Sequence, residues 1–473
     1  MRTTHRKSHK SNRKQNSTQA GLNGNRPHTG KKKSANRFNP SQTATAAAST
    51  KLNEAELVGR FTKKVPLIKV WGKQWHRYAE YWEPIERGIY KKKALGLIPK
   101  PLRSAHLASQ ILDHFEALQH LDKDEFTGAA IFDGPDILLC VANGVLRIDP
   151  TGQTKLEAFS SVYPFTMQLA AKYDPKALAP NFQETLKQAL ADPLDRELYR
   201  YWMGSILLPD SRFETALCCF GPTGTSKSTL AIGLTEALGA EPVTVLKLSE
   251  ICDSVGYRQP TLVRSMLNVS TELDAAVLEN SEDFKRLVSG EEIEAREIYG
   301  KPFKMRTSAK FLFLCNQLPR FKYGTDAELR RLQFLRFSQI PKVKDVELKK
   351  TKIPTEKDGI FILMVDYLAK LLQLGKIPDG SAESISLRER FAETNDPLAN
   401  FIKKFCVLHP QASVLKTRLL KRFAAYVIDL GLPRGITNDF FKNLYDRYPA
   451  LKPIRRRIGK IGRQQRVEGI RLR

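Results

Sequence analysis

The clearest pattern along the chain is an alternation of strand-like apolar runs and helical segments between about residues 166 and 345. A buried strand is predicted at Glu214–Phe220, followed by an amphipathic helix at Thr229–Leu238. Such alternation is typical of an α/β sheet covered by helices. Further strands are expected at Val243–Leu248, Ser265–Glu272 and Lys310–Cys315.

The preceding block, residues 52–165, has the pattern of a separate α+β domain. His106–Leu121 carries apolar residues at helical spacing, whereas Ala129–Ile148 alternates and then runs apolar as strands do. Aromatic residues gather within Val70–Glu83, and we interpret them as a small core rather than a base-stacking platform. They are Trp71, Trp75, Tyr78, Tyr81 and Trp82.

The C-terminal part begins with a helical connector at residues 346–395. In residues 396–473, helices are predicted at Ala412–Leu430 and Phe440–Arg447, the second capped within Thr437–Asp439. Pro453–Lys460 and Arg463–Arg473 would then form two basic strands around a turn. This order predicts a winged helix-turn-helix; the alternative is a small helical cap with a basic tail.

Charge indicates the class of partner. The net charge of +27 draws a protein to a polyanion through counterion release, and nucleic acid is the usual one. Residues 1–51 contain many lysines and arginines and no acidic residue, so we expect a disordered tail. This tail is either a solubilising segment or a non-specific nucleic-acid arm.

Neither membrane association nor secretion is expected for this chain. An anionic membrane surface would also attract the charge, but we find no amphipathic basic helix, no run of about 18 apolar residues and no secretory signal. The six cysteines form no CxxC pair and mostly sit in apolar runs, which disfavours zinc or a disulfide framework. We therefore expect a protein of a reducing cytoplasm.

A nucleotide site is predicted at Gly221–Ser228, between the first strand and its helix. Backbone N–H groups of such a loop and of the helix start face phosphate oxygens. Lys227 would reach the β- and γ-phosphates of ATP, and the Ser228 hydroxyl would ligate Mg²⁺. Ser226 stands where glycine is usual, which puts the affinity in question. The nucleotide-binding residues are Gly221, Pro222, Thr223, Gly224, Thr225, Ser226, Lys227, Ser228 and Thr229.

Two polar residues at strand ends complete the candidate site. Glu272 would polarise the attacking water or help to hold Mg²⁺. Asn316, after the strand Lys310–Cys315, would position water and sense the γ-phosphate. Taken alone, Asn316 is more simply explained as the start of a turn before Pro319.

These motifs occur along the chain in the same order as in a known family. The set of Gly221–Ser228, Glu272, Phe284–Ile293 and Asn316–Pro319 resembles the superfamily 3 helicases. The similarity is to the phage and plasmid primase–helicase module related to the poxvirus replication ATPase. Gly324–Asp326, Arg330, Arg331 and Phe334–Phe337 continue it, and the resemblance spans about Val70 to the C-terminus.

The resemblance implies an AAA+ core in a ring of usually six subunits, with ATP held between neighbours. Arg330 or Arg331 would be the arginine finger, with Arg331 preferred; the alternative is a pair of surface arginines. Arg296–Met305 would be the hairpin that projects into the channel, where Tyr299, Lys301 and Lys304 meet single-stranded DNA, unless it is only a solvated turn. The C-terminal DNA contacts would be Lys442, Arg447, Arg455, Arg456, Arg457 and Lys460.

The expected function is that of a helicase of a phage, plasmid or integrated element in the cytoplasm of a bacterial host cell. It would act on single-stranded DNA, with origin DNA as a second candidate partner. Primase activity is not expected, because the chain lacks room and ligands for a primase domain, so a separate primase or loader would act with it. One alternative is a DNA-binding initiator or scaffold with a weak nucleotide site, and another is an RNA-directed ATPase.

Overall fold

The computed structural model describes most of the chain after residue 52. The described ranges are 53–71, 74–121, 128–253, 256–271, 277–278, 282–318, 320–321, 330–341, 345–432, 434–457 and 463–473. The basic tail, Glu272 and Lys460 lie outside them.

The central element is a five-stranded sheet whose neighbouring strands are all parallel. This confirms the α/β sheet predicted from the alternation. The strand β9, which precedes the phosphate loop, lies between β15 and β17, so two neighbours protect both of its edges. In sheet order the strands are β10 (Val243–Thr244), β11 (Leu267–Ser270), β15 (Lys310–Cys315), β9 (Ala216–Phe220) and β17 (Leu332–Arg336).

The second predicted strand is shorter than expected. It ends at Thr244, and a short helix, α7 (Leu248–Ile251), occupies the end of the predicted range. The Asn268 side chain accepts the Leu246 N–H at 2.8 Å and donates to its carbonyl oxygen at 3.0 Å. The backbone of Leu246 is thus bonded to a side chain, and the segment Val245–Leu248 leaves the sheet.

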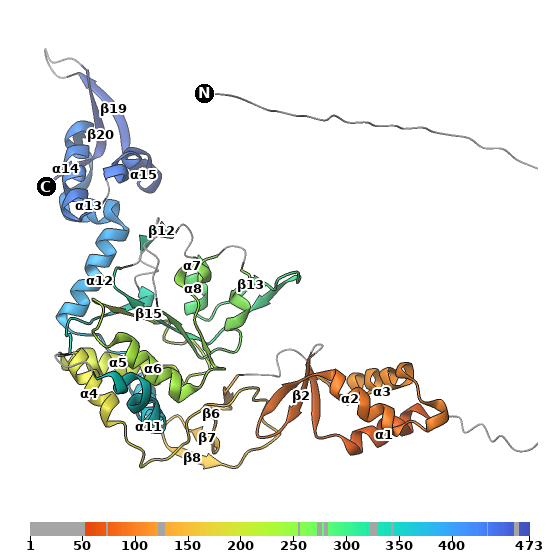
Figure 1. Ribbon diagram of the computed structural model, residues 1–473. Helices are drawn as coiled ribbons and strands as arrows, with labels where there is room; N and C mark the ends of the chain where they lie inside the picture. The colour runs from red at the N-terminus through yellow and green to blue at the C-terminus, as the bar shows by residue number, and fades with distance from the viewer. Residues whose placement is uncertain are drawn as a thin grey trace, which may run out of the picture. The chain divides into compact units, whose positions relative to one another are not determined.

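Both faces of the sheet are buried, as parallel sheets require. Leu217 and Cys219 point to one apolar cluster, whereas Ala216 and Cys218 point to another. Helices α5, α6 and α11 cover the first face, with α11 packed against the other two, and α7 and α8 contribute to the second (Figure 1). The bounds are α4 (Pro180–Ala189), α5 (Pro193–Ser205), α6 (Lys227–Leu238), α8 (Glu282–Val288), α11 (Lys357–Leu374) and α12 (Ala382–Asn395).

A four-stranded antiparallel meander precedes this sheet, as the pattern over Ala129–Ile148 predicts. Ile137, Leu139 and Leu146 belong to the same apolar cluster as Leu217 and α11. One apolar core therefore includes residues from both sides of the expected domain boundary at residue 165. The strands are β5 (Ala130–Asp133), β6 (Asp136–Val141), β7 (Gly144–Ile148) and β8 (Thr154–Glu157).

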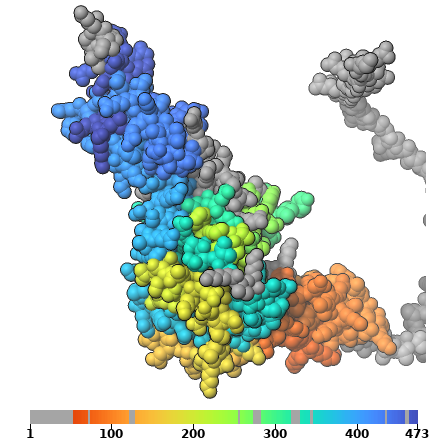
Figure 2. Space-filling view, turned by 60° about the vertical axis from the view of Figure 1, so that its left-hand side comes forward, coloured from red at the N-terminus to blue at the C-terminus, as the bar shows by residue number. Residues whose placement is uncertain are grey.

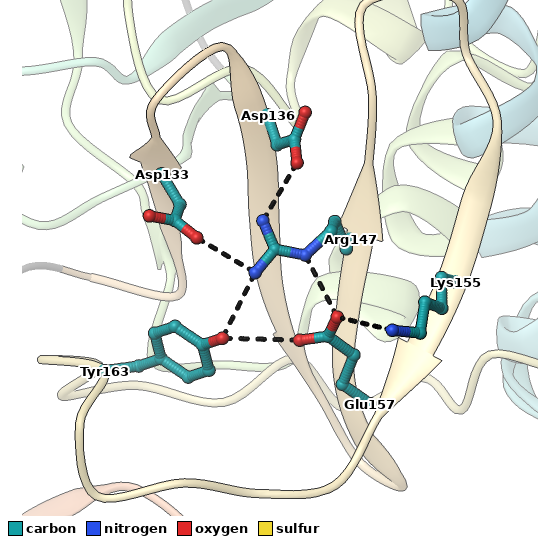
Figure 3. A network of polar contacts seen from close by, with 6 residues as sticks. All are labelled: Asp133, Asp136, Arg147, Lys155, Glu157 and Tyr163. Carbon is teal, nitrogen blue, oxygen red and sulfur yellow. Dashed lines mark hydrogen bonds and ion pairs between the residues drawn. The ribbon is translucent and has the colours of Figure 1, made fainter.

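One guanidinium holds the outer side of this meander together. Arg147 on β7 pairs with Asp133 and Asp136 at 2.9 Å each and with Glu157 at 3.0 Å (Figure 3). Tyr163 accepts from Arg147 at 3.2 Å and donates to Glu157 at 3.3 Å. Hydrogen bonding to Arg147 lowers the pKa of Glu157. One cation on β7 therefore joins the other three strands and the following loop.

Replacing Arg147 with methionine is expected to lower the free energy of unfolding by about 2 kcal/mol at neutral pH, because three carboxylates lose their cation. Since the pKa of Glu157 is lowered on folding, its contribution is present above its ordinary value near 4.5 and is lost as pH falls below it. Urea unfolding at pH 7 and pH 3 would measure this, with the smaller loss at pH 3. The control is Lys155→Met, whose exposed ammonium pairs only with Glu157 in this network and should change stability by less than about 0.5 kcal/mol. Equal losses for the two variants would contradict the prediction.

The first described segment is a small α+β unit. Trp75 and Trp82 are buried in it, which confirms a core role for these two aromatic residues. Trp75 stacks on Tyr90 of α2, and its indole N–H donates to Glu116 of α3 at 3.3 Å. Its elements are α1 (Glu54–Lys64), β1 (Ile68–Trp71), β2 (Gln74–Tyr78), β3 (Trp82–Ile85), α2 (Arg87–Leu97), η1 (Lys100–Leu102), α3 (Ala105–Leu118) and β4 (His120–Leu121).

The C-terminal residues form a lobe (Figure 2). This lobe has its own apolar core. The helix at Phe440–Arg447 is confirmed, but the expected start of the preceding helix at Ala412 is wrong. Val414 and Leu415 pair with Val467 and Arg466 in a sheet, because pairing distant in sequence overrides the local helical spacing. The elements are α13 (Pro397–Phe405), β18 (Cys406–Leu415), α14 (Lys416–Asp429), η5 (Arg434–Thr437), α15 (Phe440–Arg447), β19 (Lys452–Arg457) and β20 (Arg463–Leu472), with sheet order β18-β20-β19.

The remaining elements connect these units. A single π-turn at Leu348–Lys352 leads through α10 (Ile353–Thr355) into α11. The other short elements are η3 (Gln259–Leu262), β12 (Val277–Leu278), β13 (Ile293–Arg296), β14 (Pro302–Met305) and β16 (Arg320–Phe321). Within the described ranges, no helix combines the length and apolar character needed to cross a bilayer.

Candidate functional site

The phosphate loop leaves β9 at the carboxyl edge of the sheet and ends at α6. Gly221 begins it with φ 157°, and its N–H donates to the carbonyl oxygen of Cys315 on the neighbouring strand at 3.0 Å. A Cβ at Gly221 would lie 1.9 Å from the carbonyl oxygen of Phe337. Only glycine therefore fits where the loop turns between two strands.

Ser226 adopts the left-handed conformation at the start of α6, with φ 65° and ψ 7°. This is the position where the sequence departs from the usual glycine. Its carbonyl oxygen accepts the Leu230 N–H at 3.1 Å and so forms part of the first helical turn. The loop keeps its turn despite the serine, at a cost of about 1–2 kcal/mol in backbone strain.

Ser226→Gly is expected to raise the free energy of unfolding by about 1 kcal/mol, because the relieved strain exceeds the extra chain entropy of glycine. Thermal unfolding would measure it. The matched control is Ser228→Gly, where the residue lies inside the helix and the same change should destabilise. Equal effects at both positions would show that the left-handed conformation is not the cause.

Lys227 is the first residue of α6, and 9% of its surface is exposed. Its ammonium donates to the carbonyl oxygens of Gly221 and Pro222 at 2.6 and 2.8 Å, and to the Thr225 hydroxyl at 3.3 Å. Burial lowers the pKa of Lys227. The cation is therefore positioned by the loop itself, under the concave side that phosphate oxygens would enter.

A pocket of about 790 Å³ opens over this loop. Thr223–Thr229, Thr271 at the end of β11 and Asn316 at the end of β15 line it. The Asn316 amide donates to the Thr223 hydroxyl at 3.3 Å, and Ser228 is exposed in the first turn of α6. The structure thus brings the predicted loop, Ser228 and Asn316 together at one edge.

This donor set fits a nucleotide with Mg²⁺. Lysine, helix-start N–H groups and hydroxyls are the groups that hold phosphates and their metal. Glu272, the expected acid, lies outside the described residues, but Thr271 immediately before it lines the pocket.

The two candidate finger arginines differ in their surroundings. Arg331 precedes β17 and is 17% exposed; its guanidinium donates to the Ser289 hydroxyl at 2.7 Å and pairs with Glu214 at 3.2 Å. Glu214 precedes β9, so this group lies at the amino edge, opposite the phosphate loop. Arg330 is exposed. Neither arginine can reach the loop of its own chain across the sheet.

A two-stranded hairpin, β13 and β14, presents Tyr299 at its tip. Tyr299 is fully exposed and has φ 62°, an uncommon conformation for an aromatic residue. Lys301 beside it is also exposed, whereas Lys304 pairs with Glu292 at 2.8 Å. Tyr299 and Lys301 are therefore presented at the tip, and Lys304 is engaged within the hairpin.

The predicted C-terminal contact residues also divide into two groups. Arg447 makes a two-point ion pair with Asp396, whose distances are 2.6 and 2.8 Å, and so ties α15 to the start of α13. Lys442, Arg455 and Arg456 are exposed. The side chain of Arg457 and all of Lys460 lie outside the part that the structure describes.

Sequence reasoning missed half of the pocket. Helix α4 contributes Glu184 and Gln188, and the segment after β17 contributes Ile340, Val346 and Lys349. These positions carry no motif and lie 33 or more residues before the loop or over 110 after it, so only the fold brings them to the phosphate loop.

Comparisons with known proteins give a partial match. A family model described as a family of unknown function (DUF5906) matches residues 219–331, from β9 to Arg331. No curated protein matches the chain. Three solved structures of the NrS-1 C-terminal region are similar, each over 88% of this chain and 99% of that chain. Two A-form apo structures have TM-scores of 0.49 with 11% and 12% identity, and a further apo structure has 0.47 with 12%.

Proposed function

We propose that this chain is an ATP-hydrolysing DNA helicase of a phage, plasmid or integrated element, with an AAA+ core of the superfamily 3 type. The observation that carries the proposal is the convergence of Lys227, Ser228 and Asn316 on one pocket at the carboxyl edge of a parallel sheet. In open α/β sheets, ligands bind at this edge.

Each residue has a chemical task. Lys227 stabilises negative charge on the β- and γ-phosphates, and the Ser228 hydroxyl holds Mg²⁺, which neutralises phosphate charge when bound. Asn316 orients the attacking water from the neighbouring strand, and Glu272 accepts its proton. The helix-start N–H groups of α6 fix the phosphates in line for displacement.

An arginine from the next subunit completes the site. Arg330 and Arg331 lie at the sheet edge opposite the phosphate loop, which suits action on a neighbour in a ring of six. Since Arg331 is held by Glu214 and Ser289, the exposed Arg330 is the better candidate for the finger.

DNA would meet two surfaces. The tip of the β13–β14 hairpin offers Lys301 for a backbone phosphate and Tyr299 for a base, the combination used by single-strand binding sites. The C-terminal helices and three-stranded sheet have the element order of a winged helix-turn-helix, with Lys442, Arg455 and Arg456 free of the Asp396 ion pair. These cations would position the duplex through its phosphates.

Steady-state ATP hydrolysis with and without single-stranded DNA tests the proposal. We expect DNA to stimulate turnover, and RNA to stimulate it less. Stimulation by RNA alone would favour an RNA-directed ATPase. Absence of turnover with any nucleic acid would overturn the motor, and the exposed cations of the C-terminal lobe would then favour a DNA-binding initiator or scaffold.

A further inference from the structure

The phosphate loop accounts for only part of the lining of the 790 Å³ pocket. Glu184 and Gln188 on α4 and Ile340 and Val346 after β17 also line it. We propose that these four side chains form a nucleobase subsite selective for adenine. The inference rests on the proposed function, because it concerns the same nucleotide.

The apolar part of this subsite consists of two exposed side chains. Ile340 is 57% and Val346 is 65% exposed, so neither contributes to the core beneath the sheet. Both line the pocket, where a planar base would cover the apolar surface that they present. A base packed against them would remove this surface from contact with water and gain an affinity that phosphates alone do not provide.

The polar part is fixed on a short helix. α4 contacts α6, the helix that starts at the phosphate loop (Figure 1). The Glu356 carboxylate accepts the N–H groups of Asn181 and Phe182, both at 2.9 Å, and so anchors the first turn of α4. Glu184 and Gln188 lie one turn apart on the exposed side, and the Gln188 amide donates to the Glu184 carboxylate at 2.9 Å.

This hydrogen bond sets the pattern that a base would meet. With one N–H of Gln188 held by Glu184, the amide oxygen and the second N–H remain for the ligand. Glutamine pairs in this way with the N6 amino group and N7 of adenine. Guanine places O6 where adenine has its amino group, so two acceptors would oppose each other.

The second lining segment is also held in place. Asp345 accepts the N–H groups of Glu347 and Leu348 at 2.9 and 3.1 Å and pairs with Lys352 at 2.6 Å. This turn fixes the backbone on both sides of Val346. Lys349, which also lines the pocket, places a cation within reach of the nucleotide on the same segment.

Equilibrium binding of Mg-ATP, Mg-GTP and inorganic tripolyphosphate to the full chain tests the subsite. Wild type should bind ATP about tenfold more tightly than GTP, since a good two-point base contact discriminates by about 5- to 150-fold. Ile340→Ser should weaken ATP about tenfold and tripolyphosphate less than twofold. Gln188→Leu should bring ATP affinity close to that of GTP.

The matched control is Ile428→Ser on α14, where an isoleucine of similar exposure, 52%, lies outside the pocket lining. It should leave all three affinities unchanged. Equal affinities for ATP and GTP, together with no effect of Ile340→Ser, would overturn the subsite. Tripolyphosphate binding that depends on Lys227 would in that case still support the phosphate site. Tighter binding of GTP would overturn the assignment of adenine. Failure of both ATP and tripolyphosphate to bind would overturn the subsite and the proposed function together.

Discussion

Lys227→Ala is expected to reduce DNA-stimulated ATP turnover by about 10²–10³-fold or more, the range seen when one transition-state donor is removed. The ammonium is held within the loop by three oxygen acceptors within 3.3 Å. Steady-state phosphate release at saturating ATP would measure the loss.

Two further measurements separate chemistry from folding. The control Lys92→Ala removes an exposed lysine of α2 and should retain full turnover. Thermal unfolding should show that Lys227→Ala stays folded, because a buried cation and its desolvation cost are removed together. Retained turnover in a folded Lys227→Ala chain would place the reaction elsewhere.

Arg330→Ala is expected to lower turnover by about 10³–10⁵-fold if this residue is the finger of a neighbouring site. Its own nucleotide affinity should change little, because the arginine does not reach the loop of its own chain. Arg331→Ala should instead lower the melting temperature, since it breaks the contacts with Glu214 and Ser289. A reversal of these two phenotypes would assign the finger to Arg331.

Mixing the inactive variants tests whether the arginine acts between subunits. Arg330→Ala chains keep Lys227, and Lys227→Ala chains keep Arg330, so a mixed ring contains some complete sites. Turnover should reappear on mixing and depend on total protein concentration. Mixtures as inactive as the separate variants would mean that the arginine acts within one chain, or that no ring forms.

The sequence predicted best what is local. Gly221, Lys227 and the strand Lys310–Cys315 follow from short patterns, and the structure has each of them at the predicted position. The strand expected to continue to Leu248 failed because the Asn268 side chain replaces a strand partner, which periodicity does not reveal. The helix expected from Ala412 failed because β20, some 50 residues later, pairs with that segment.

The site was predicted only where motifs exist. Arg447 was expected at DNA, yet its ion pair with Asp396 is a contact between residues 51 positions apart. Gln188 and Ile340 carry no signal, since a glutamine on an exposed helix face and an isoleucine after a strand are ordinary residues. Their relation to the phosphate loop arises from packing of α4 on α6 and from the parallel sheet.

The group formed by Arg331, Glu214 and Ser289 stands at one end of a strand whose other end is the phosphate loop. β9 has five residues, so about 17 Å of backbone, paired on both edges, separates this group from the phosphate loop. A strand bonded on both edges does not bend or slide on its own. In a ring, a displacement of Glu214 by a neighbouring subunit would therefore be transmitted along β9 and would displace the phosphate loop at Gly221. Adjacent sites would then hydrolyse ATP in sequence rather than independently.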